Sequence, residues 1–438
     1  MHILLISNYS NDRQESMQRY ADMLATGLPA LGVKVTMIRP EPYLGRLKPA
    51  GHGVGKWLGY IDKFIIFPIR LRWLVRHARR RSSVPPKLLA PSSQLLASDL
   101  PSSVSPSTVN RPPCEPCSQP SSASPALRPS GLPASGLIVH ICDHSNAMYA
   151  LHLTGVPHVV TCHDLLAVRS ALGHFPENKV GWAGRRLQHW IVRGLRHAAS
   201  VVCDSEATRT DLLALGGIAP SQATTIHIGL NHPYGVRDEA WLKTALADLP
   251  QVESLGAGGY IFHVGGNQWY KNREGLLRIY FSYVKQGGRL PLVMAGKLLT
   301  TEQQALVAAR PEGATVITLG NVTNDQLNAL YGRAACLLFP SLQEGFGWPV
   351  LEAMSAGCPV VCSDRASLPE VGGEAAVYFD PADEASATCQ LATLLAEPTM
   401  TREFRIRAGL EQAGRFNTHD MLQQLVGHYQ KLEIKDEE

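Results

Sequence analysis

The sequence predicts an α/β protein built from two parallel-sheet domains, and two observations lead to this prediction. Short apolar runs rich in valine and isoleucine recur along the chain, and longer stretches of helical spacing lie between most of them. The same pattern runs twice, over residues 1–230 and again from about residue 258. Apolar runs of this kind are typical of parallel strands that helices cover on both faces.

Each expected strand is a short apolar run. The expected strands are Ile3–Ile6, Val33–Ile38, Leu137–Ile141, His158–Thr161, Ser200–Cys203, Tyr260–Val264, Leu292–Ala295, Val316–Leu319, Cys336–Phe339 and Pro359–Cys362. The alternative, a set of antiparallel sandwiches, would need alternating strands and hairpin turns, and few are visible. We expect a first domain over residues 1–230, a linker over 231–259, a second domain over 260–414, and a helix from 415 that packs back.

Composition excludes some classes of protein. Of 438 residues, 41 are Lys or Arg and 37 are Asp or Glu, which is too balanced for a general nucleic-acid binder. Met1–Ile6 lacks a basic leader and reads as a strand, and no run reaches the ~18 apolar residues that span a bilayer. Five of the nine cysteines lie in or beside apolar runs and are expected to be free thiols: Cys142, Cys162, Cys203, Cys336 and Cys362. We therefore expect a cytoplasmic protein.

One segment interrupts the strand–helix pattern. Residues 82–136 contain 12 prolines and 15 serines, so we expect a disordered insertion. It includes the CxxC pair Cys114 and Cys117, but a zinc site needs two more ligands nearby and none is obvious. We interpret the spacing as coincidence.

A basic segment precedes the insertion. Residues 46–81 hold ten Lys and Arg against a single acid, Asp62, and bulky apolar residues lie between the charges. Pro68 is expected to break this run. Such a segment could lie on an anionic membrane at the inner face, or its apolar face could pack on the first sheet while the charges are solvated. We favour packing, and both could hold in part.

The densest motif begins at Glu344 and reads EGFGWPVLEAMSAGCPV. It follows the strand Cys336–Phe339, so its loop lies at the carboxyl edge of the sheet, where open α/β folds bind ligands. Pro349 suits the first position of a short helix, whose N-terminus forms an anion site. Glu344 and Glu352 would then flank a phosphate, which indicates a nucleotide sugar. Either glutamate alone could be a solvated surface group.

This motif resembles the E-x7-E motif of the retaining glycosyltransferases of family four (group 1), which have the GT-B fold of two Rossmann-like domains facing a cleft. The resemblance implies that Glu344 contacts the donor sugar and that Glu352 binds the ribose. It further implies that the amides of Gly345, Phe346 and Gly347 hold sugar hydroxyls, and that those of Val350 and Leu351 meet the diphosphate.

A second strand-to-helix turn follows Tyr260–Val264 and contains Gly265, Gly266 and Lys271. Lys271 would neutralise the leaving diphosphate, or it could be a solvated lysine at the start of a helix. Where the family often has an arginine as a second cation, this chain has Gly266 and Tyr270, so Arg273 or Lys297 could substitute. Lys297 ends a strand at the same edge.

In the first domain, His163 follows a strand and could bond a sugar hydroxyl or the reacting centre, or serve as a cap. Four further residues are expected on the acceptor side: Asn8, Asp143, Asn146 and Asp164. A helix N-cap explains Asp143 equally well. The family's glycine-rich turn after the first strand is missing here, which leaves Asn8 and Ser10 to supply contacts.

These features predict a retaining glycosyltransferase that moves a hexose, with mannose the candidate, from a nucleotide-diphosphate sugar to a glycan or lipid-linked acceptor. No D-x-D occurs, so no metal or other cofactor is expected. The alternatives are a GT-B-like epimerase or phosphorylase, or a non-catalytic sugar-nucleotide binder. A Rossmann oxidoreductase would need G-x-G-x-x-G after the first strand, which is absent.

Overall fold

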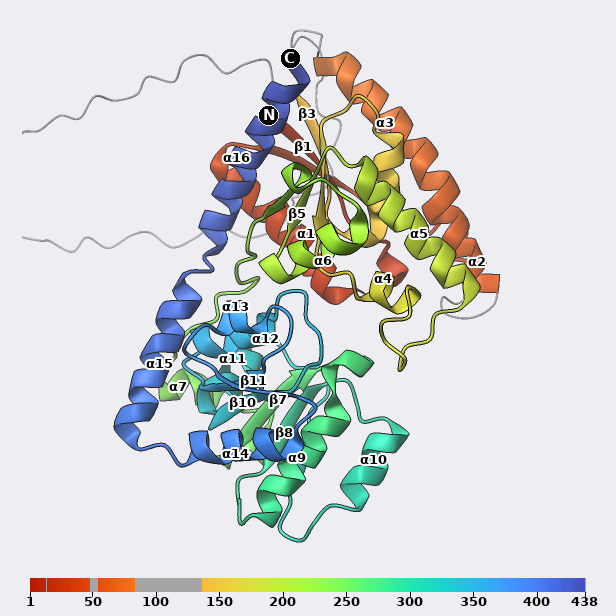
Figure 1. The fold of residues 1–438 in the computed structure, drawn as a ribbon. Helices are drawn as coiled ribbons and strands as arrows, with labels where there is room; N and C mark the ends of the chain where they lie inside the picture. The colour runs from red at the N-terminus through yellow and green to blue at the C-terminus, as the bar shows by residue number, and fades with distance from the viewer. Residues whose placement is uncertain (13, 48–53, 83–135, 438) are drawn as a thin grey trace, which may run out of the picture.

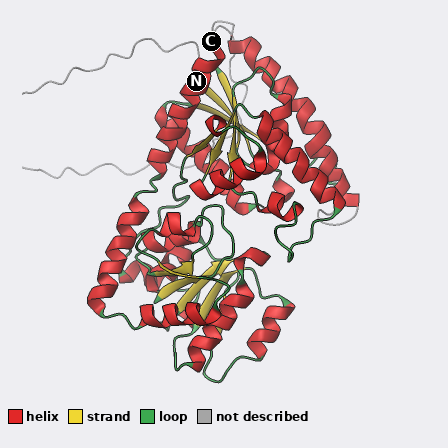
Figure 2. Cartoon of the chain, viewed as in Figure 1, coloured by secondary structure: helices red, strands yellow, loops and turns green. Residues whose placement is uncertain are grey.

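The computed structural model describes every residue except 13, 48–53, 83–135 and 438 (Figure 1). The described chain forms two lobes, each with a central sheet and helices on both faces (Figure 2). All strand pairs in both sheets are parallel. The predicted fold class, two parallel-sheet domains of the GT-B type, is confirmed. The insertion and its CxxC pair lie outside the described residues.

The first sheet has the order β2-β1-β3-β4-β5-β6. Its strands are β1 (His2–Ile6), β2 (Lys34–Ile38), β3 (Leu137–Ile141), β4 (His158–Cys162), β5 (Ser200–Cys203) and β6 (Ala223–Thr225). The flanking helices are α1 (Glu15–Gly27), α2 (Val54–Ile61), α3 (Phe67–Ser82), α4 (Leu166–Ala171), α5 (Trp182–His197) and α6 (Glu206–Gly216). Strands β3, β4 and β5 are buried along their whole length, which explains their continuous apolar runs.

The second sheet has the order β12-β11-β10-β7-β8-β9. Its strands are β7 (Ile261–Gly265), β8 (Leu292–Gly296), β9 (Val316–Thr318), β10 (Cys336–Phe339), β11 (Val360–Ser363) and β12 (Val377–Phe379). The flanking helices are α9 (Arg273–Lys285), α10 (Thr301–Ala308), α11 (Asn324–Arg333), α12 (Trp348–Ser355), α13 (Leu368–Gly372), α14 (Glu384–Leu395) and α15 (Thr399–Gly414). Two short helices, α7 (Glu239–Ala245) and α8 (Pro250–Glu253), lie between the sheets in sequence.

The last helix, α16 (Thr418–Glu437), returns to the first lobe (Figure 1). The Tyr429 hydroxyl lies 2.5 Å from Nδ1 of His140 on β3, and the Gly136 amide donates to Glu433 at 2.7 Å. The largest buried apolar cluster runs from Leu24 on α1 through Tyr429 to Phe262 on β7. The two lobes therefore share one continuous core.

The prediction that Pro68 breaks the basic segment is wrong. A π-helical turn, η3 (Asp62–Ile66), joins α2 to α3, and the amide of Phe67 donates to the Asp62 carbonyl five residues back. Proline lacks an amide proton and its ring crowds the carbonyl four residues earlier. The wider π-turn lies immediately before Pro68 and accommodates both effects, so the helix continues.

Among the described residues, no helix is both long and apolar enough to cross a membrane. The five cysteines named above are buried free thiols, as the sequence predicts.

Candidate active site

The loop before α12 carries the first predicted glutamate. Gly347 has a φ of +102°, a conformation that favours glycine, and it lets the chain turn from the loop into α12. The helix begins at Trp348, so Pro349 occupies its second position, one residue later than predicted. The Val350 amide donates to the Gly347 carbonyl at 3.0 Å. That amide is therefore not free for a diphosphate in this arrangement.

Glu344 and Lys271 come together from separate strand–helix turns. Lys271 ends a short 3-10 turn, η6 (Trp269–Lys271), and its Nζ lies 2.7 Å from Oε1 of Glu344. The side chains are only 15% and 9% exposed, respectively. The next residue, Asn272, donates to the Pro340 carbonyl at 3.1 Å and so ties the two turns together. The two predicted catalytic residues of the second lobe thus form one charged pair.

A cavity of about 300 Å³ lies beside this pair. Glu344 and Gln343 line it from the second lobe, and Asp164, Arg169 and Thr208 line it from the first. Glu344 and the predicted acceptor-side residue Asp164 therefore face the same space between the lobes.

Gly345 is the point where the lobes meet most closely. Its carbonyl accepts hydrogen bonds from the hydroxyls of Ser205, at 2.6 Å, and Thr208, at 3.0 Å. A Cβ atom at position 345 would lie 1.8 Å from the His163 carbonyl oxygen, so only glycine fits. Phe346 is buried, and its carbonyl accepts from Ser367 at 2.8 Å.

Glu352 is buried rather than open to the cleft. It is 4% exposed, and one carboxylate oxygen accepts a hydrogen bond from Tyr331 at 2.9 Å. Burial raises the pKa of Glu352 to about 7, although Tyr331, Arg19 and Lys271 oppose the shift. Tyr331 takes only one carboxylate oxygen, but burial leaves little of the carboxylate open to a ribose.

The remaining donor-side residues lie at the carboxyl ends of β7 and β8. A Cβ atom at Gly296 would lie 2.4 Å from the Gly265 carbonyl oxygen, so the two strand ends are tightly apposed. Gly266 follows in the turn, and Lys297 is exposed. Arg273 is buried and donates to the Lys297 carbonyl at 2.9 Å and to Asn267. It holds these two loops together, so it does not supply the second cation.

His163 is held by two acceptors. Its Nε2 lies 2.8 Å from the Cys142 carbonyl and its Nδ1 lies 2.5 Å from a carboxylate oxygen of Asp204. Since both partners accept, both ring nitrogens donate, which describes an imidazolium. Burial alone would lower the pKa of His163, but Asp204 outweighs it and raises the pKa to about 9. Neither nitrogen is left for a sugar hydroxyl in this arrangement.

Asn8, Asp143 and Asn146 form a buried network at the ends of β1 and β3. Asn8 donates to Asp143 at 2.5 Å, and Asn146 donates to Asn8 at 3.0 Å. Asp143 also caps the 3-10 turn η4 (His144–His152), accepting from the Ser145 amide at 2.7 Å. The N-cap interpretation of Asp143 therefore holds. Asp164 precedes the N-cap residue of α4, and its carboxylate accepts from the Leu166 amide at 2.9 Å.

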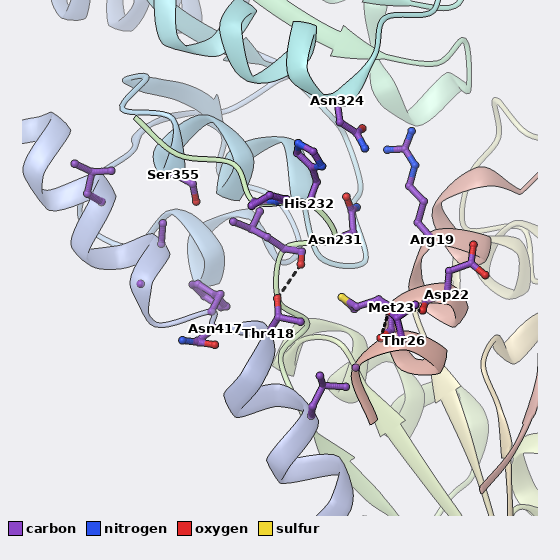
Figure 3. A pocket seen from close by; sticks show the side chains of 18 residues that line it. Arg19, Asp22, Met23, Thr26, Asn231, His232, Asn324, Ser355, Asn417 and Thr418 are labelled. Carbon is purple, nitrogen blue, oxygen red and sulfur yellow. Dashed lines mark hydrogen bonds between the residues drawn. The ribbon is translucent and has the colours of Figure 1, made fainter. Parts of the chain in front are cut away.

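Sequence reasoning missed Arg19. Figure 3 shows its side chain extending from α1 toward Asn324 at the start of α11, in a cavity of about 750 Å³ near the junction of the lobes. Its positive charge lowers the pKa of Glu352 against the effect of burial. Arg19 is the fifth residue of α1, and its local sequence does not distinguish it from a solvated surface arginine.

The family described as "Glycosyl transferases group 1" matches residues 250–410, and the one described as "Glycosyltransferase Family 4" matches residues 137–232. One match lies largely in each lobe. The chain belongs to this glycosyltransferase family. It is therefore an enzyme of the family-4 glycosyltransferases.

Similar proteins include O-antigen chain mannosyltransferase B of Escherichia coli, 29% identical over 63% of this chain and 70% of that protein. The serotype-specific mannosyltransferase WbdA of E. coli is 27% identical over 59% of this chain. That match spans only 31% of WbdA, so this chain corresponds to about a third of its length.

Solved structures resemble the whole chain. The structure of Anabaena HepE with UDP and glucose has a TM-score of 0.63, at 14% identity over 98% of this chain and all of that one. Sucrose-phosphate synthase from Thermosynechococcus elongatus has a TM-score of 0.65, at 17% identity over 99% of this chain and all of that one. These likenesses concern the fold.

Proposed function

We propose that this glycosyltransferase transfers mannose from a nucleotide-diphosphate sugar to a glycan or lipid-linked acceptor, with retention of configuration. The observation that carries the proposal is the Lys271–Glu344 pair, whose glutamate lines a cavity between the lobes. Mannose as the sugar is supported by the names of the relatives, which include two E. coli mannosyltransferases and an MMP α-(1→4)-mannosyltransferase from Mycolicibacterium hassiacum.

Lys271 is proposed to stabilise the leaving group. Breaking a bond between a sugar and a phosphate builds negative charge on the departing oxygen, and a fixed cation at that point lowers the barrier. Glu344 positions the Lys271 ammonium at 2.7 Å and leaves its second oxygen available to accept from a sugar hydroxyl. In this proposal, Lys271 contacts the departing phosphate oxygen and Glu344 holds the sugar, so the pair positions both sides of the bond that breaks.

Arg19 is proposed as the second cation. It comes from the opposite lobe and points toward Asn324 (Figure 3), and within the described residues no ion pair to a carboxylate satisfies it. A guanidinium in this position can bond phosphate oxygens in pairs. Arg19→Ala is then expected to raise the KM for the donor more than it lowers kcat.

The contacts between the lobes describe a closed arrangement. Gly345 lies against His163, and the Glu370 carboxylate accepts from the amides of Glu206 and Ala207 at the start of α6. We infer that the lobes separate to admit the donor and close again to exclude water, which limits hydrolysis. Asp164, which lines the cavity opposite Glu344, is the acceptor-side candidate that this arrangement favours.

The test begins with thermal shifts in UDP-, GDP-, ADP- and TDP-sugars, because a ligand that binds the folded protein raises its melting temperature. GDP-mannose is expected to give the largest shift. Transfer to mannose-containing oligosaccharides is then followed by NMR of the anomeric proton, which should report the configuration of the donor. Inversion, or a shift with another sugar nucleotide alone, would contradict the proposal.

A further inference from the structure

The helix α2–η3–α3 carries two apolar faces. One face packs on the first lobe through Phe67, Leu71 and Val75, which are almost fully buried. The Phe67 ring lies 4.9 Å from that of Tyr149, measured between centroids. This face satisfies the packing role that amphipathicity in the sequence predicts.

A second apolar face points to solvent. Its members are Trp57, Ile65, Ile69 and Trp73, which are 67%, 55%, 64% and 57% exposed. We call these four residues the exposed stripe. Ile69 lies two residues from both Phe67 and Leu71, so at about 100° per residue it is on the opposite side of the helix from them. More than half of the surface of each of these side chains is open to solvent.

The exposed stripe keeps to one line because of the π-helical turn. Its members are separated by multiples of four residues, and in an α-helix each step of four overshoots a full turn by about 40°. A π-turn holds more residues per turn and offsets part of this drift. The turn η3 lies between Trp57 and Ile69, so it brings the first member of the stripe into line with the later ones.

Arginines surround the exposed stripe. At about 100° per residue, Arg72 and Arg76 lie on the same side of the helix as Ile65 and Ile69. Going around the helix from Ile69 past Trp73, the next of these side chains is Arg70. All three are exposed, and their recorded partners are neutral: Arg70 donates to the Tyr43 hydroxyl and Arg72 lies 2.8 Å from His152. Among the residues that the structure describes, no carboxylate forms an ion pair with them. The single acid of the helix, Asp62, is buried and accepts from the amides of Leu44 and Gly45.

We propose that the exposed stripe of α2–η3–α3 docks the enzyme on an anionic phospholipid surface. Tryptophan and isoleucine suit the boundary between headgroups and acyl chains, and uncompensated arginines attract anionic headgroups. A second copy of the chain is a poorer occupant, because two such faces repel each other. The insertion is also poorer, because almost half of residues 82–136 are proline or serine.

Docking would place the enzyme's cleft near the membrane. The buried end of η3 contacts Tyr9 through Asp62, and Tyr9 follows Asn8 at the carboxyl end of β1. The part of the helix that carries Ile65, near the middle of the exposed stripe, therefore lies close to the acceptor-side residues. A lipid-linked acceptor would reach the cleft without leaving the bilayer surface.

The test is co-sedimentation of the full chain with vesicles of phosphatidylcholine alone and of phosphatidylcholine with one third phosphatidylglycerol. Binding is expected only to the anionic vesicles, and it should weaken as salt rises. The triple variant W57S/I65S/I69S keeps every charge and is expected to bind at least tenfold more weakly, with an unchanged melting temperature. The variant R70Q/R72Q/R76Q should lose the preference for anionic vesicles.

The matched control is M400S/F404S, which removes two exposed apolar side chains from α15 on the other lobe. It is expected to bind vesicles like the unaltered protein. Equal binding by W57S/I65S/I69S, or no binding by the unaltered protein, would overturn the proposal. So would a change of the triple variant from dimer to monomer in sedimentation velocity, since the stripe would then be a contact between copies. Because no donor is present, these outcomes are independent of the proposed reaction.

Discussion

The carboxyl edges of the two sheets, one in each lobe, differ in how their polar side chains are hydrogen-bonded. We call them the first edge and the second edge. In the first lobe, Asn8, Asp143 and Asn146 bond one another, and His163 is held by Asp204 and a carbonyl. In the second lobe, Glu344 lines a cavity and pairs with Lys271, and Glu352 is buried with a raised pKa. The first edge is therefore a rigid frame of internal hydrogen bonds, although Asn146 Oδ1 and Asp204 Oδ1 have no partner among the described residues. The second edge holds a charged pair that a ligand could contact.

The largest expected effect is on stability and concerns the first edge. Asp204→Ala leaves the His163 imidazolium without its partner and should lower the free energy of unfolding by about 3–5 kcal/mol. The measurement is urea denaturation. The control Asp380→Ala removes an exposed partner of Arg365 and should leave the free energy of unfolding nearly unchanged. Equal losses in the two variants would contradict a rigid first edge.

The same pair sets a pH dependence. The pKa of His163 is raised from 6.5 to about 9 in the folded protein, because Asp204 outweighs the effect of burial. Its stabilisation is thus fully present below pH 6.5 and is lost as the pH rises through about 9. Unfolding of Asp204→Asn should lack this decline.

The next effect is on catalysis and concerns the second edge. Glu344→Gln removes the charge that positions Lys271 and should lower transfer about 10²–10³-fold, or about 2.7–4 kcal/mol, at an unchanged melting temperature. Glu312→Gln changes an exposed glutamate before the amino end of β9 and is expected to retain full activity. Near-normal transfer by Glu344→Gln would remove this residue from the site.

A smaller effect should appear at Glu352. Its pKa is raised by burial from 4.5 to about 7, so between these values the folded protein holds a proton that the unfolded chain has lost. Stability therefore falls as the pH rises from 4.5 to 7 and stays lower above it. Glu352→Gln removes this loss and should stabilise the ligand-free protein by roughly 3 kcal/mol at pH 8. No difference should remain below pH 4, and stabilisation there would contradict the explanation.

The smallest effect concerns a contact that joins the two edges. Glu370 accepts from His227 and from the first amides of α6. Burial alone would raise the pKa of Glu370, but these partners hold it below 4.5. Glu370→Gln should cost about 0.3–1 kcal/mol at pH 7 and nothing once the pH has fallen through the folded pKa. A larger loss would mean that this contact controls closure.

Most of the fold could be predicted because buried parallel strands leave continuous apolar runs. Leu137–Ile141, Ser200–Cys203 and Cys336–Phe339 agree with the structure residue for residue. The strands β6 and β12 were missed; each is a three-residue strand at a sheet edge, although β9, which is equally short and also at an edge, was predicted. The continuity of the helix through Pro68 was missed because a π-turn has no signature in composition.

The candidate site was less predictable than the fold. The sequence predicted that Glu344 follows the end of a strand. It could not predict that Lys271, from a separate strand–helix turn, pairs with Glu344. Sequence could not show that Glu352 faces Tyr331, that Arg273 ties two loops, or that His163 has both nitrogens occupied. Each depends on residues more than twenty positions away, and hydrogen bonds over such separations leave no local pattern.

The position of α16 has a consequence for biosynthesis. Its residues Leu425 and Tyr429 are fully buried against α1 and β3, at the other end of the sequence. A ribosome synthesises the first sheet long before this helix emerges, so the first lobe must wait with an uncovered apolar surface until α16 has been translated. The second lobe has all its strands by Phe379 and can be completed earlier.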